Sequence, residues 1–340
     1  MSAKDVDVLV VGGGPVGLAA AIEARLAGLT VAIIEPREGV IDKACGEGLM
    51  PGALPLLARL GVDPEGMPLR GVRYTNGHRH ADHLFRSGPG RGVRRTALHD
   101  ALTRRAAELG TERVHARVEH LEQDATGVTA NGIRASWLFG VDGLHSTVRQ
   151  LAELEGTVSR RRRFGLRQHF AVEPWTDLIE VHWAQHAEVY VTPVSSTEVG
   201  IAILGPPRTD FDETVASIAA LAAHLAGAEP SSGLRGAGPF RQRTTRPSSG
   251  RVLLIGDASG YVDAITGEGL RLGFEQARIA VEHVTGAGNY DRAWAKTTRD
   301  FRVLTSRLVR AATSPLRPAI VPTAALLPAV FGSVVEKLAR

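Results

Sequence analysis

The sequence predicts an α/β fold in which one α/β domain is interleaved with a smaller, mostly antiparallel β-sheet domain. Residues 5–35 follow the pattern strand, glycine-rich turn, helix, strand, which is typical of a βαβ unit. Residues 161–204 instead carry longer strands of the antiparallel type. A strand at 251–257 and a long helix from 267 to about 284 then restore the α/β pattern.

The length of the chain, 340 residues, suits one large domain or two of ordinary size. Hydrophobic residues make up 44% and charged residues 22%, which excludes a disordered chain, a coiled coil and a polytopic membrane protein. We therefore expect two discontinuous domains and an apolar tail. The α/β domain takes residues 1–68, 93–155 and 240–312, the sheet domain takes 69–92 and 156–239, and the tail takes 313–340.

The first half of the chain alternates strands and helices. The continuous apolar run at 5–11 is typical of a central parallel strand, and Gly28 ends the alanine-rich helix that follows. Asn76-Gly77 signals a hairpin turn between two strands within 71–85. The other predictions are helices at 15–27, 52–61 and 97–109 and strands at 30–35, 113–121, 127–130 and 133–141.

The second half predicts a helix at 211–226, a loose segment at 227–239 and an unusual end to the sequence. Residues 318–335 carry no charge and approach the length of a membrane span. Pro318, Pro322 and Pro328 interrupt any helix there. We expect a tail packed on the body of the protein, with a lipophilic lid or a peripheral membrane contact as the alternative.

The charge pattern argues against a nucleic-acid partner. The net charge of +4 is small, and the basic run Arg160–Arg163 contains no aromatic residue that could stack on a base. We interpret this run as a solvent-exposed segment between the domains that leads into a strand.

The sequence features that bear on the compartment are the single cysteine and the N-terminal pattern. Cys45 is the single cysteine, so no internal disulfide can form. Asp5 and Asp7 interrupt the first apolar run, unlike in a signal peptide. A cytoplasmic protein is expected, and its oligomeric state stays open.

A glycine fingerprint, Gly12-x-Gly14-x-x-Gly17, lies between the first strand and the first helix. Gly12 permits the tight turn, Gly14 lets a diphosphate approach the backbone, and Gly17 allows the helix to pack closely on the strand. The helix begins at Pro15, and its free amide groups favour phosphate. The fingerprint therefore predicts a dinucleotide site.

Glu35 at the end of the second strand defines that site further. Its carboxylate can accept hydrogen bonds from both ribose hydroxyls, and it would repel a 2′-phosphate. Pro36 and Arg37 follow it at the rim of the same site. FAD or NAD is therefore favoured over NADP as the tightly bound nucleotide.

Two later motifs distinguish FAD from NAD. Asp142-Gly143-x-x-Ser146-x-Val148-Arg149 follows one strand, and Gly256-Asp257-Ala258 follows another. With the fingerprint and the helix Arg95-x-x-Leu98-x-x-x-Leu102, they resemble the p-hydroxybenzoate hydroxylase-type superfamily of FAD-dependent oxidoreductases. The resemblance covers nearly the whole chain and implies a FAD-binding, Rossmann-like domain of the glutathione reductase type.

The resemblance also implies roles for single residues. Asp257, next to Gly256, would hydrogen-bond the ribityl chain of FAD. Asp142 and Gly143 would lie near the diphosphate, on the approach path of a nicotinamide donor, and Arg95 would reach the cofactor from its helix. Backbone amides that face the pyrimidine edge of the flavin would come from Gly267, Glu268 and Gly269.

A second resemblance narrows the family to the geranylgeranyl reductase-related branch. It is carried by the segments Lys43-Ala44-Cys45-Gly46-Glu47-Gly48-Leu49 and Thr266-Gly267-Glu268-Gly269. Cys45 and Gly46 would then lie in a loop beside the flavin. Cys45 is either a substrate-side contact, a redox-sensitive thiol or a small buried residue.

Further catalytic candidates lie in the antiparallel region. His182 and His186 could place a base toward the substrate, or could be packed strand residues. Tyr190 falls where the sheet of the related proteins faces the flavin.

A histidine-rich segment beside the predicted hairpin has spacing that could ligate a metal ion. We interpret it as a solvated cluster and expect no metal. Its members are His78, His80, Asp82 and His83.

The resemblance implies two competing reactions, of which we favour the first and keep the second as the alternative. The first is an NADH- or NADPH-dependent monooxygenase that hydroxylates a lipophilic aromatic or polyketide-type molecule through a flavin hydroperoxide. The second is an ene reductase that delivers hydride to an isoprenoid double bond. A halogenase is less favoured because a Trp-x-Trp-x-Ile-Pro segment is absent, and a non-enzymatic FAD-binding scaffold is less favoured because Asp257 and the fingerprint are present.

Overall fold

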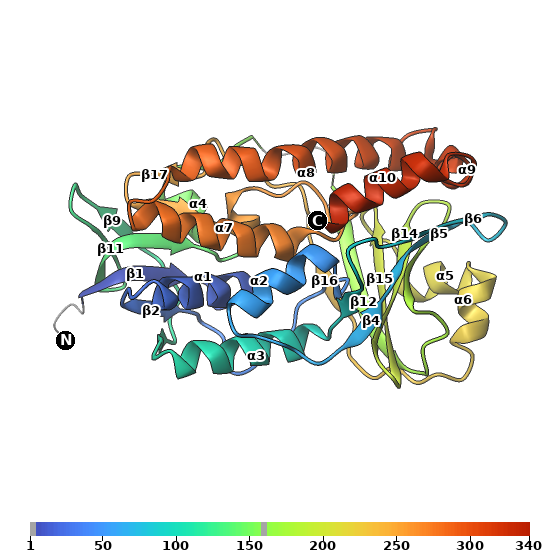
Figure 1. Ribbon diagram of the computed structural model, residues 1–340, viewed down its shortest axis with the longest axis horizontal. Coiled ribbons are helices and arrows are strands. Elements are labelled where there is room, and N and C mark those ends of the chain that lie inside the picture. The colour runs from blue at the N-terminus through green and yellow to red at the C-terminus, as the bar shows by residue number, and fades with distance from the viewer. Residues whose placement is uncertain (1–4, 158–161) are drawn as a thin grey trace.

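The computed structural model describes residues 5–157 and 162–340 and confirms the predicted α/β fold. Figure 1 shows an elongated molecule with an α/β region at one end and an antiparallel sheet at the other. Arg160 and Arg161 lie outside the described residues.

The α/β region is built on a sheet of eight strands with the order β17-β18-β11-β1-β2-β8, and β10 joins β11 to β9. Its central strands β18, β11, β1, β2 and β8 pair in parallel. The strands are β1 (Asp5–Val11), β2 (Val31–Ile34), β8 (Glu112–Val114), β9 (Leu121–Gln123), β10 (Val128–Ala130), β11 (Ile133–Gly140), β17 (Ser248–Ser249) and β18 (Val252–Leu254).

Helices α1, α3 and α7 cover one face of this sheet, and the other face packs against α4 and residues of β9 and β10. Helix α1 packs between α3 and α7, and α8 packs along α7. Because Ala19–Ala21 on α1 are fully buried, the helix can lie close to the strands. The helices are α1 (Pro15–Leu26), α2 (Leu54–Arg59), α3 (Arg95–Glu108), α4 (Thr147–Leu151), α7 (Gly269–Val284) and α8 (Tyr290–Ala312), with short 3-10 turns η1 (Pro51–Ala53) and η2 (Gly256–Ser259).

The second sheet has seven strands in the order β16-β12-β15-β14-β13-β5-β6, and all pairs except β13 with β5 are antiparallel. One face packs against α5 (Phe211–Ala216) and α6 (Ala219–His224), and the other face turns toward the α/β region. Its strands are β5 (Gly71–Thr75), β6 (His80–Leu84), β12 (Phe164–Ala171), β13 (Leu178–Trp183), β14 (Glu188–Ser195), β15 (Glu198–Gly205) and β16 (Arg235–Ala237).

A third, small sheet joins the two regions. It has the order β3-β7-β4 and consists of β3 (Gly48–Leu49), β4 (Met67–Leu69) and β7 (Gly90–Gly92). Strand β7 lies against β14 of the larger sheet: a Cβ on Gly92 would be 1.8 Å from the carbonyl oxygen of Pro193. Glycine is therefore required where the two sheets meet.

Several sequence predictions about elements were wrong in detail. The strand expected at 113–121 is two strands, because β8 pairs with β2 while β9 pairs with β10 beyond β11. The helix expected at 211–226 breaks after Ala216, where the Ser217 hydroxyl bonds the Thr214 carbonyl and Ile218 is extended. The loose segment 227–239 contains β16, which pairs with β12.

The prediction that the basic run 160–163 is solvated was wrong for Arg163, which is buried. Arg163 is 8% exposed and donates to Glu188, while its Nε lies 3.1 Å from Asp263. Glu188 also pairs with Arg317 at the start of the tail. This arginine therefore joins three segments that are distant in the sequence.

The tail forms η3 (Arg317–Ala319), α9 (Ile320–Leu326) and α10 (Pro328–Ala339), which pack on β6. Among the described residues no single helix has the length and apolarity to cross a membrane; residues 317–326 and 328–339 reach them only as a pair that bends by 105°. Four large apolar side chains near this bend are exposed by 51–72%: Leu316, Leu326, Leu327 and Val330.

Candidate active site

The predicted nucleotide-binding segments come together at one edge of the parallel sheet. Strands β18, β11, β1 and β2 are neighbours in that order, and each runs in the same direction. Gly12, Glu35, Asp142 and Gly256 follow their carboxyl ends. This is the edge at which open α/β sheets bind ligands.

The glycine fingerprint is sterically required here. Gly12 has φ of +113°, and a Cβ on it would lie 2.5 Å from the carbonyl oxygen of Val141. A Cβ on Gly17 would lie 1.8 Å from the carbonyl oxygen of Gly12. Gly14 precedes α1 without a side-chain cap, and Pro15 is the first helical residue. The α1 N-terminus therefore offers uncapped amides to an anion.

Glu35 is ionised and tightly bound in the structure. Burial alone would raise its pKa, but the bonds from Arg37 and from the Gly13 amide outweigh burial and lower it. Its Oε2 accepts from the Gly13 N–H at 2.8 Å, and Arg37 donates through its backbone N–H, Nε and Nη2. A ribose would thus replace contacts of Arg37, whose side chain is 43% exposed, while Pro36 lies exposed beside it.

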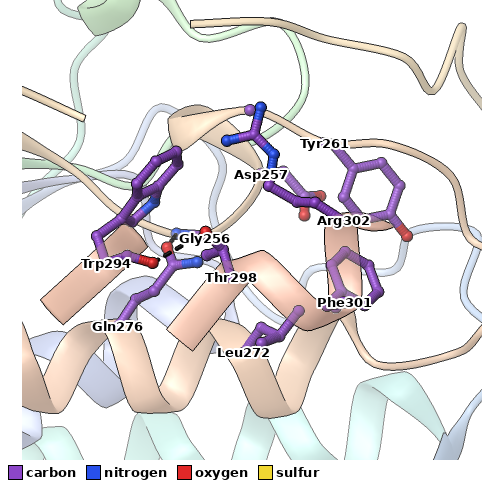
Figure 2. Close-up of a pocket in the computed structure, with 11 residues that line it drawn as sticks. Gly256, Asp257, Tyr261, Leu272, Gln276, Trp294, Thr298, Phe301 and Arg302 are labelled. Carbon is purple, nitrogen blue, oxygen red and sulfur yellow. Dashed lines mark hydrogen bonds between the residues drawn. The ribbon is translucent and has the colours of Figure 1, made fainter. Parts of the chain in front are cut away.

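The turn that carries Asp257 is fixed from behind by a buried network (Figure 2). The Gly256 N–H donates to Gln276 Oε1 at 2.7 Å, and Trp294 Nε1 donates to Ser259 Oγ at 2.9 Å. Gly256 has φ of +63°, which favours glycine. Burial raises the pKa of Asp257, and Lys43 and Arg95 oppose this effect. The backbone of the turn that carries Asp257 is therefore held in place at the edge of the site.

A cavity of about 20 Å³, room for one water molecule, lies between this turn and helices α7 and α8. It is too small for a flavin ring, so it is not the nucleotide site itself. Figure 2 shows residues that line it: Gly256, Asp257, Tyr261, Leu272, Gln276, Trp294, Thr298, Phe301 and Arg302.

The Asp142-Gly143 segment is tied to the Asp257 turn by Arg149. This side chain is 1% exposed and donates to the carbonyl oxygens of Ala258 and Leu144. Asp142 accepts from the Val148 N–H through Oδ2, whereas its buried Oδ1 has no protein partner. Burial raises the pKa of Asp142.

Two cationic side chains lie beside the fingerprint. Arg95, the first residue of α3, is 8% exposed, and its buried Nη1 has no protein partner. Lys43 Nζ lies 3.7 Å from the position that a Cβ on Gly143 would take. Burial, with the charges of Arg37 and Arg95, lowers the pKa of Lys43, and Asp257 and Glu35 oppose that shift. These charges suit a diphosphate.

The start of α7 supplies a buried carboxyl group. Glu268 is 2% exposed, its Oε1 has no protein partner, and burial raises its pKa to about 7 against the opposing effect of Arg271. Gly267 has φ of +69°, and a Cβ on Gly269 would be 3.5 Å from the ring of Tyr261. The backbone conformation therefore favours glycine at Gly267, whereas a side chain at Gly269 would make only ordinary van der Waals contact with Tyr261.

On the substrate side, the structure brings Cys45, Gly46 and Tyr190 to the face between the two regions. The Thr192 hydroxyl donates to the Gly46 carbonyl at 2.9 Å, and the Tyr190 hydroxyl donates to the Ile265 carbonyl at 2.8 Å. Burial raises the pKa of both Cys45 and Tyr190. Both groups therefore keep their protons at neutral pH.

His182 and His186 are not brought to this face. His182 pairs across β13 and β14 with Val189, which packs against α5 and α6, so it points away from Tyr190. His186 is exposed in the turn between the two strands. Neither residue is adjacent to the candidate site.

The histidine-rich hairpin makes ordinary surface pairs. Asp82 pairs with Arg73, His83 lies 2.8 Å from Glu336 on α10, and His78 and His80 are exposed. Within residues 5–157 and 162–340, His, Cys, Asp and Glu side chains form no group of three that could hold a metal ion.

Sequence reasoning missed several side chains that contact the Cys45 loop. Lys43 and Glu47 lie within segment 43–49, which carries the second resemblance, but the sequence pattern predicts no role for either side chain. Arg167 and His169 on β12 are 1% and 0% exposed and reach this loop. Their spacing of two residues, which puts both on one face of a strand, was the available signal.

These residues fit FAD. Buried polar atoms of Arg95, Asp142 and Glu268 have no protein partner, and the nearest atom that a Cβ on Gly14 would meet is Arg95 Nη2 at 3.9 Å, which leaves room at the start of α1. Arg95 and Lys43 would face the diphosphate, Glu35 the ribose and Asp257 the ribityl hydroxyls.

Comparison with known proteins identifies a FAD-binding family and relatives named as reductases and as monooxygenases. A family model described as FAD binding domain matches residues 5–283. Menaquinone reductase of Mycolicibacterium smegmatis is 29% identical over 325 residues, 85% of this chain and 79% of that protein. The 12-dehydrotetracycline 5-monooxygenase/anhydrotetracycline 6-monooxygenase of Streptomyces rimosus is 28% identical over 320 residues, 80% of this chain but 61% of that protein.

Solved structures share the fold. A flavin-dependent brominase superposes with a TM-score of 0.82 at 19% identity, covering 99% of this chain and 94% of the brominase. A geranylgeranyl bacteriochlorophyll reductase-like protein from Thermoplasma acidophilum gives a TM-score of 0.78 at 18% identity, covering 99% of both chains. The predicted FAD-binding family is confirmed by the family model, and the matched relatives include both reductases and monooxygenases.

Proposed function

The chain belongs to the FAD binding domain family and is a FAD-dependent oxidoreductase, and on that premise we propose that it reduces a carbon–carbon double bond in a lipophilic, isoprenoid-bearing molecule. NADH or NADPH is the proposed electron donor. FAD, when bound, supplies the hydride for such a reduction. The chain itself must bind and orient the substrate, exclude water and deliver a proton.

The position of Cys45 is the observation that carries this proposal: Gly46 next to it accepts from the Thr192 hydroxyl of β14, and Glu47 accepts from the Arg95 N–H at the start of α3. Reduction of a double bond adds hydride to one carbon and a proton to the other, so it needs a side chain that keeps its proton until that moment. Burial raises the pKa of Cys45, Tyr190 and Tyr261. Arg95 also lies beside the fingerprint, since its Nη2 is 3.9 Å from the position that a Cβ on Gly14 would take. The Cys45 loop therefore runs between the second sheet and the nucleotide end of the site. We propose Cys45 as the proton donor.

The apolar face of the second sheet is the proposed substrate surface. Tyr74 packs against Trp183 and against Phe331 of α10, with ring centroids 5.4 Å and 4.9 Å apart. Tyr190 lies on the same face and reaches Ile265 in the segment before α7. Trp183 and Phe331 are buried in the apolar cluster under the tail, so a long apolar substrate would reach this face by displacing part of the tail.

The extent of the matches supports the same choice. The menaquinone reductase is matched over 79% of its length, whereas the tetracycline monooxygenase is matched over 61%. Hydroxylation remains the second candidate, favoured by the 28% identity to that monooxygenase over 80% of this chain.

One incubation separates the two reactions. The FAD-loaded protein is incubated with NADH or NADPH and either a prenylated quinone or a polycyclic phenol, in air and without oxygen, and the products are weighed. Without oxygen, the prenylated quinone is expected to gain two hydrogens in its isoprenoid chain, weighed after any quinol has been reoxidised to the quinone so that ring reduction does not count. Gain of one oxygen atom from the phenol, in air alone, would overturn the proposed reduction in favour of hydroxylation.

The exposed bend of the tail is the proposed contact with a lipid surface that holds such a substrate. Leu326 and Leu327 are 72% and 51% exposed there. The protein should sediment with phospholipid vesicles, and Leu326→Glu with Leu327→Glu should reduce the bound fraction at least about fivefold, since a charge on the apolar contact opposes insertion. Equal sedimentation of both proteins would remove this contact from the proposal.

A further inference from the structure

Loop 42–48 is held against the second sheet by two side chains of β12. Arg167 donates to the carboxylate of Asp42 and, at 3.1 Å, to the carbonyl oxygen of Lys43. His169 contacts the carboxylate of Glu47 through Nε2. The two contacts hold the loop at both ends, with Cys45 between them.

The proton on His169 can be assigned from its other neighbours. Arg167 Nη1 lies 3.1 Å from His169 Nδ1, and Ser232 Oγ lies 2.8 Å from the same atom. Because a guanidinium only donates, Nδ1 must accept, and the ring proton then lies on Nε2. His169 therefore donates to Glu47, and the chain of hydrogen bonds from Arg167 to Glu47 runs in one direction.

The contact with His169 helps to fix the backbone conformation of the loop at Glu47. Glu47 has φ of +59°, a conformation that costs a non-glycine residue about 1 kcal/mol or more. Its Oε1 accepts from the Arg95 N–H at 2.7 Å, and its own N–H lies 3.4 Å from Cys45 Sγ, to which it donates. The carboxylate contacts thus hold a turn that folds back onto the thiol.

The neighbouring strands leave room for this contact. Gly200 lies directly opposite His169 on β15, and a Cβ there would be 3.2 Å from Glu47 Oε2. Thr192, opposite Gly200 on β14, donates to the carbonyl oxygen of Gly46. Three adjacent strands therefore meet one turn of the loop.

We propose that Glu47 and His169 are positioning residues: their buried hydrogen bond fixes the turn at residues 45–47, and so sets where the Cys45 thiol and the Gly46 backbone stand at the FAD crevice. This inference deepens the proposed function by explaining how the proton donor is placed, and it applies equally to the second candidate reaction. Breaking the bond frees the turn while leaving the fingerprint intact.

The test uses Cys45 as a reporter, because it is the single cysteine in the sequence. Its reaction rate with Ellman's reagent is measured in the FAD-free protein. His169→Gln places an amide donor near the position of Nε2, whereas His169→Asn reaches only the position of Nδ1. A hydrogen bond to a charged group is worth about 1.5–3 kcal/mol, so His169→Asn should raise the rate about tenfold or more and His169→Gln less than about threefold.

A matched control tests whether any lost histidine has this effect. His83 also pairs with a glutamate, Glu336, but on the tail. His83→Asn should leave the labelling rate of Cys45 within about twofold of the parent rate. Equal rates for the asparagine and glutamine variants of His169, or an equal rise in His83→Asn, would overturn the proposal. Melting temperatures of all variants show which of them fail to fold. If His169→Asn does not fold, Glu47→Gln is used in its place, with the same expected rise in the labelling rate of Cys45.

FAD affinity, measured by quenching of flavin fluorescence, gives the second readout. His169→Asn should weaken FAD binding about tenfold and His169→Gln should restore it, since Gly46 and Arg95 both move with Glu47. Unchanged labelling together with weakened FAD binding would contradict the positioning role. If His169→Asn labels faster but the parent protein catalyses neither candidate reaction, the positioning role is supported and the proposed function fails. The failure of one proposal is therefore distinguishable from the failure of the other.

Discussion

The two ends of the candidate site are built in different ways. At the nucleotide end, turns after parallel strands are shaped by glycines whose Cβ atoms would collide with backbone, as at Gly12 and Gly17. At the substrate end, segments far apart in the sequence are joined by buried charges, such as Glu188 with Arg163 and Arg317. Backbone shape therefore fixes one end, and charge pairing fixes the other.

The largest expected effect comes from breaking a charge pair at the substrate end. Arg317→Ala removes one of the ion-pair partners of Glu188, which is fully buried. It also removes the donors to three backbone carbonyl oxygens. Loss of one partner of a buried pair costs about 3–5 kcal/mol. Chemical denaturation should show a fall of at least about 3 kcal/mol, whereas Arg310→Ala on the exposed surface should change stability by less than about 0.5 kcal/mol. Similar values for the two variants would contradict the comparison.

The next effect comes from crowding the backbone at the nucleotide end. Gly17→Ala puts a Cβ 1.8 Å from the carbonyl oxygen of Gly12, and a backbone atom cannot rotate away. We expect a loss of about 1–3 kcal/mol in stability and at least about a hundredfold weaker FAD binding, about 2.7 kcal/mol, measured by fluorescence titration. Gly233→Ala, where a Cβ meets nothing within 4 Å, is the control. Near-normal FAD affinity in Gly17→Ala would show that the loop shape is not limiting.

A pH profile sharpens the comparison at the start of α7. Burial raises the pKa of Glu268 to about 7 from 4.5, so the folded FAD-free protein holds this proton while the unfolded chain loses it. Stability from this group is present below pH 4.5 and is lost as pH rises to about 7. Glu268→Gln should therefore gain about 2–3 kcal/mol relative to the parent between pH 5 and pH 8. Parallel stability curves for the two proteins would exclude the raised pKa.

The smallest effect concerns Arg37. Its side chain donates hydrogen bonds to both oxygens of the Glu35 carboxylate, and the ribose hydroxyls would compete for the same oxygens. Arg37→Ala removes this competition, which is worth about 0.5–1.5 kcal/mol, so FAD affinity should rise about threefold at moderate salt. A fall in affinity would mean that Arg37 acts mainly on the phosphates.

The difference between the two ends explains what the sequence could predict. Gly12, Glu35, Asp142 and Asp257 each follow a strand, and local pattern was enough to predict that they share one sheet edge. The Glu47–His169 contact spans 122 positions and depends on sheet register, which no local pattern encodes. His182 shows the same limit, because the register of β13 with β14 decides which face it occupies.

Helix α8 has a consequence for motion. Its 23 residues form a rod about 35 Å long. Trp294 near one end bonds the Asp257 turn, Thr305 lies 3.1 Å from Thr266 before α7, and Val309 near the other end joins the core under the tail. Such a strut resists hinge bending between the two regions. Entry and exit of large molecules should therefore depend on local rearrangement of loops and of the tail, with the two sheets moving as one unit.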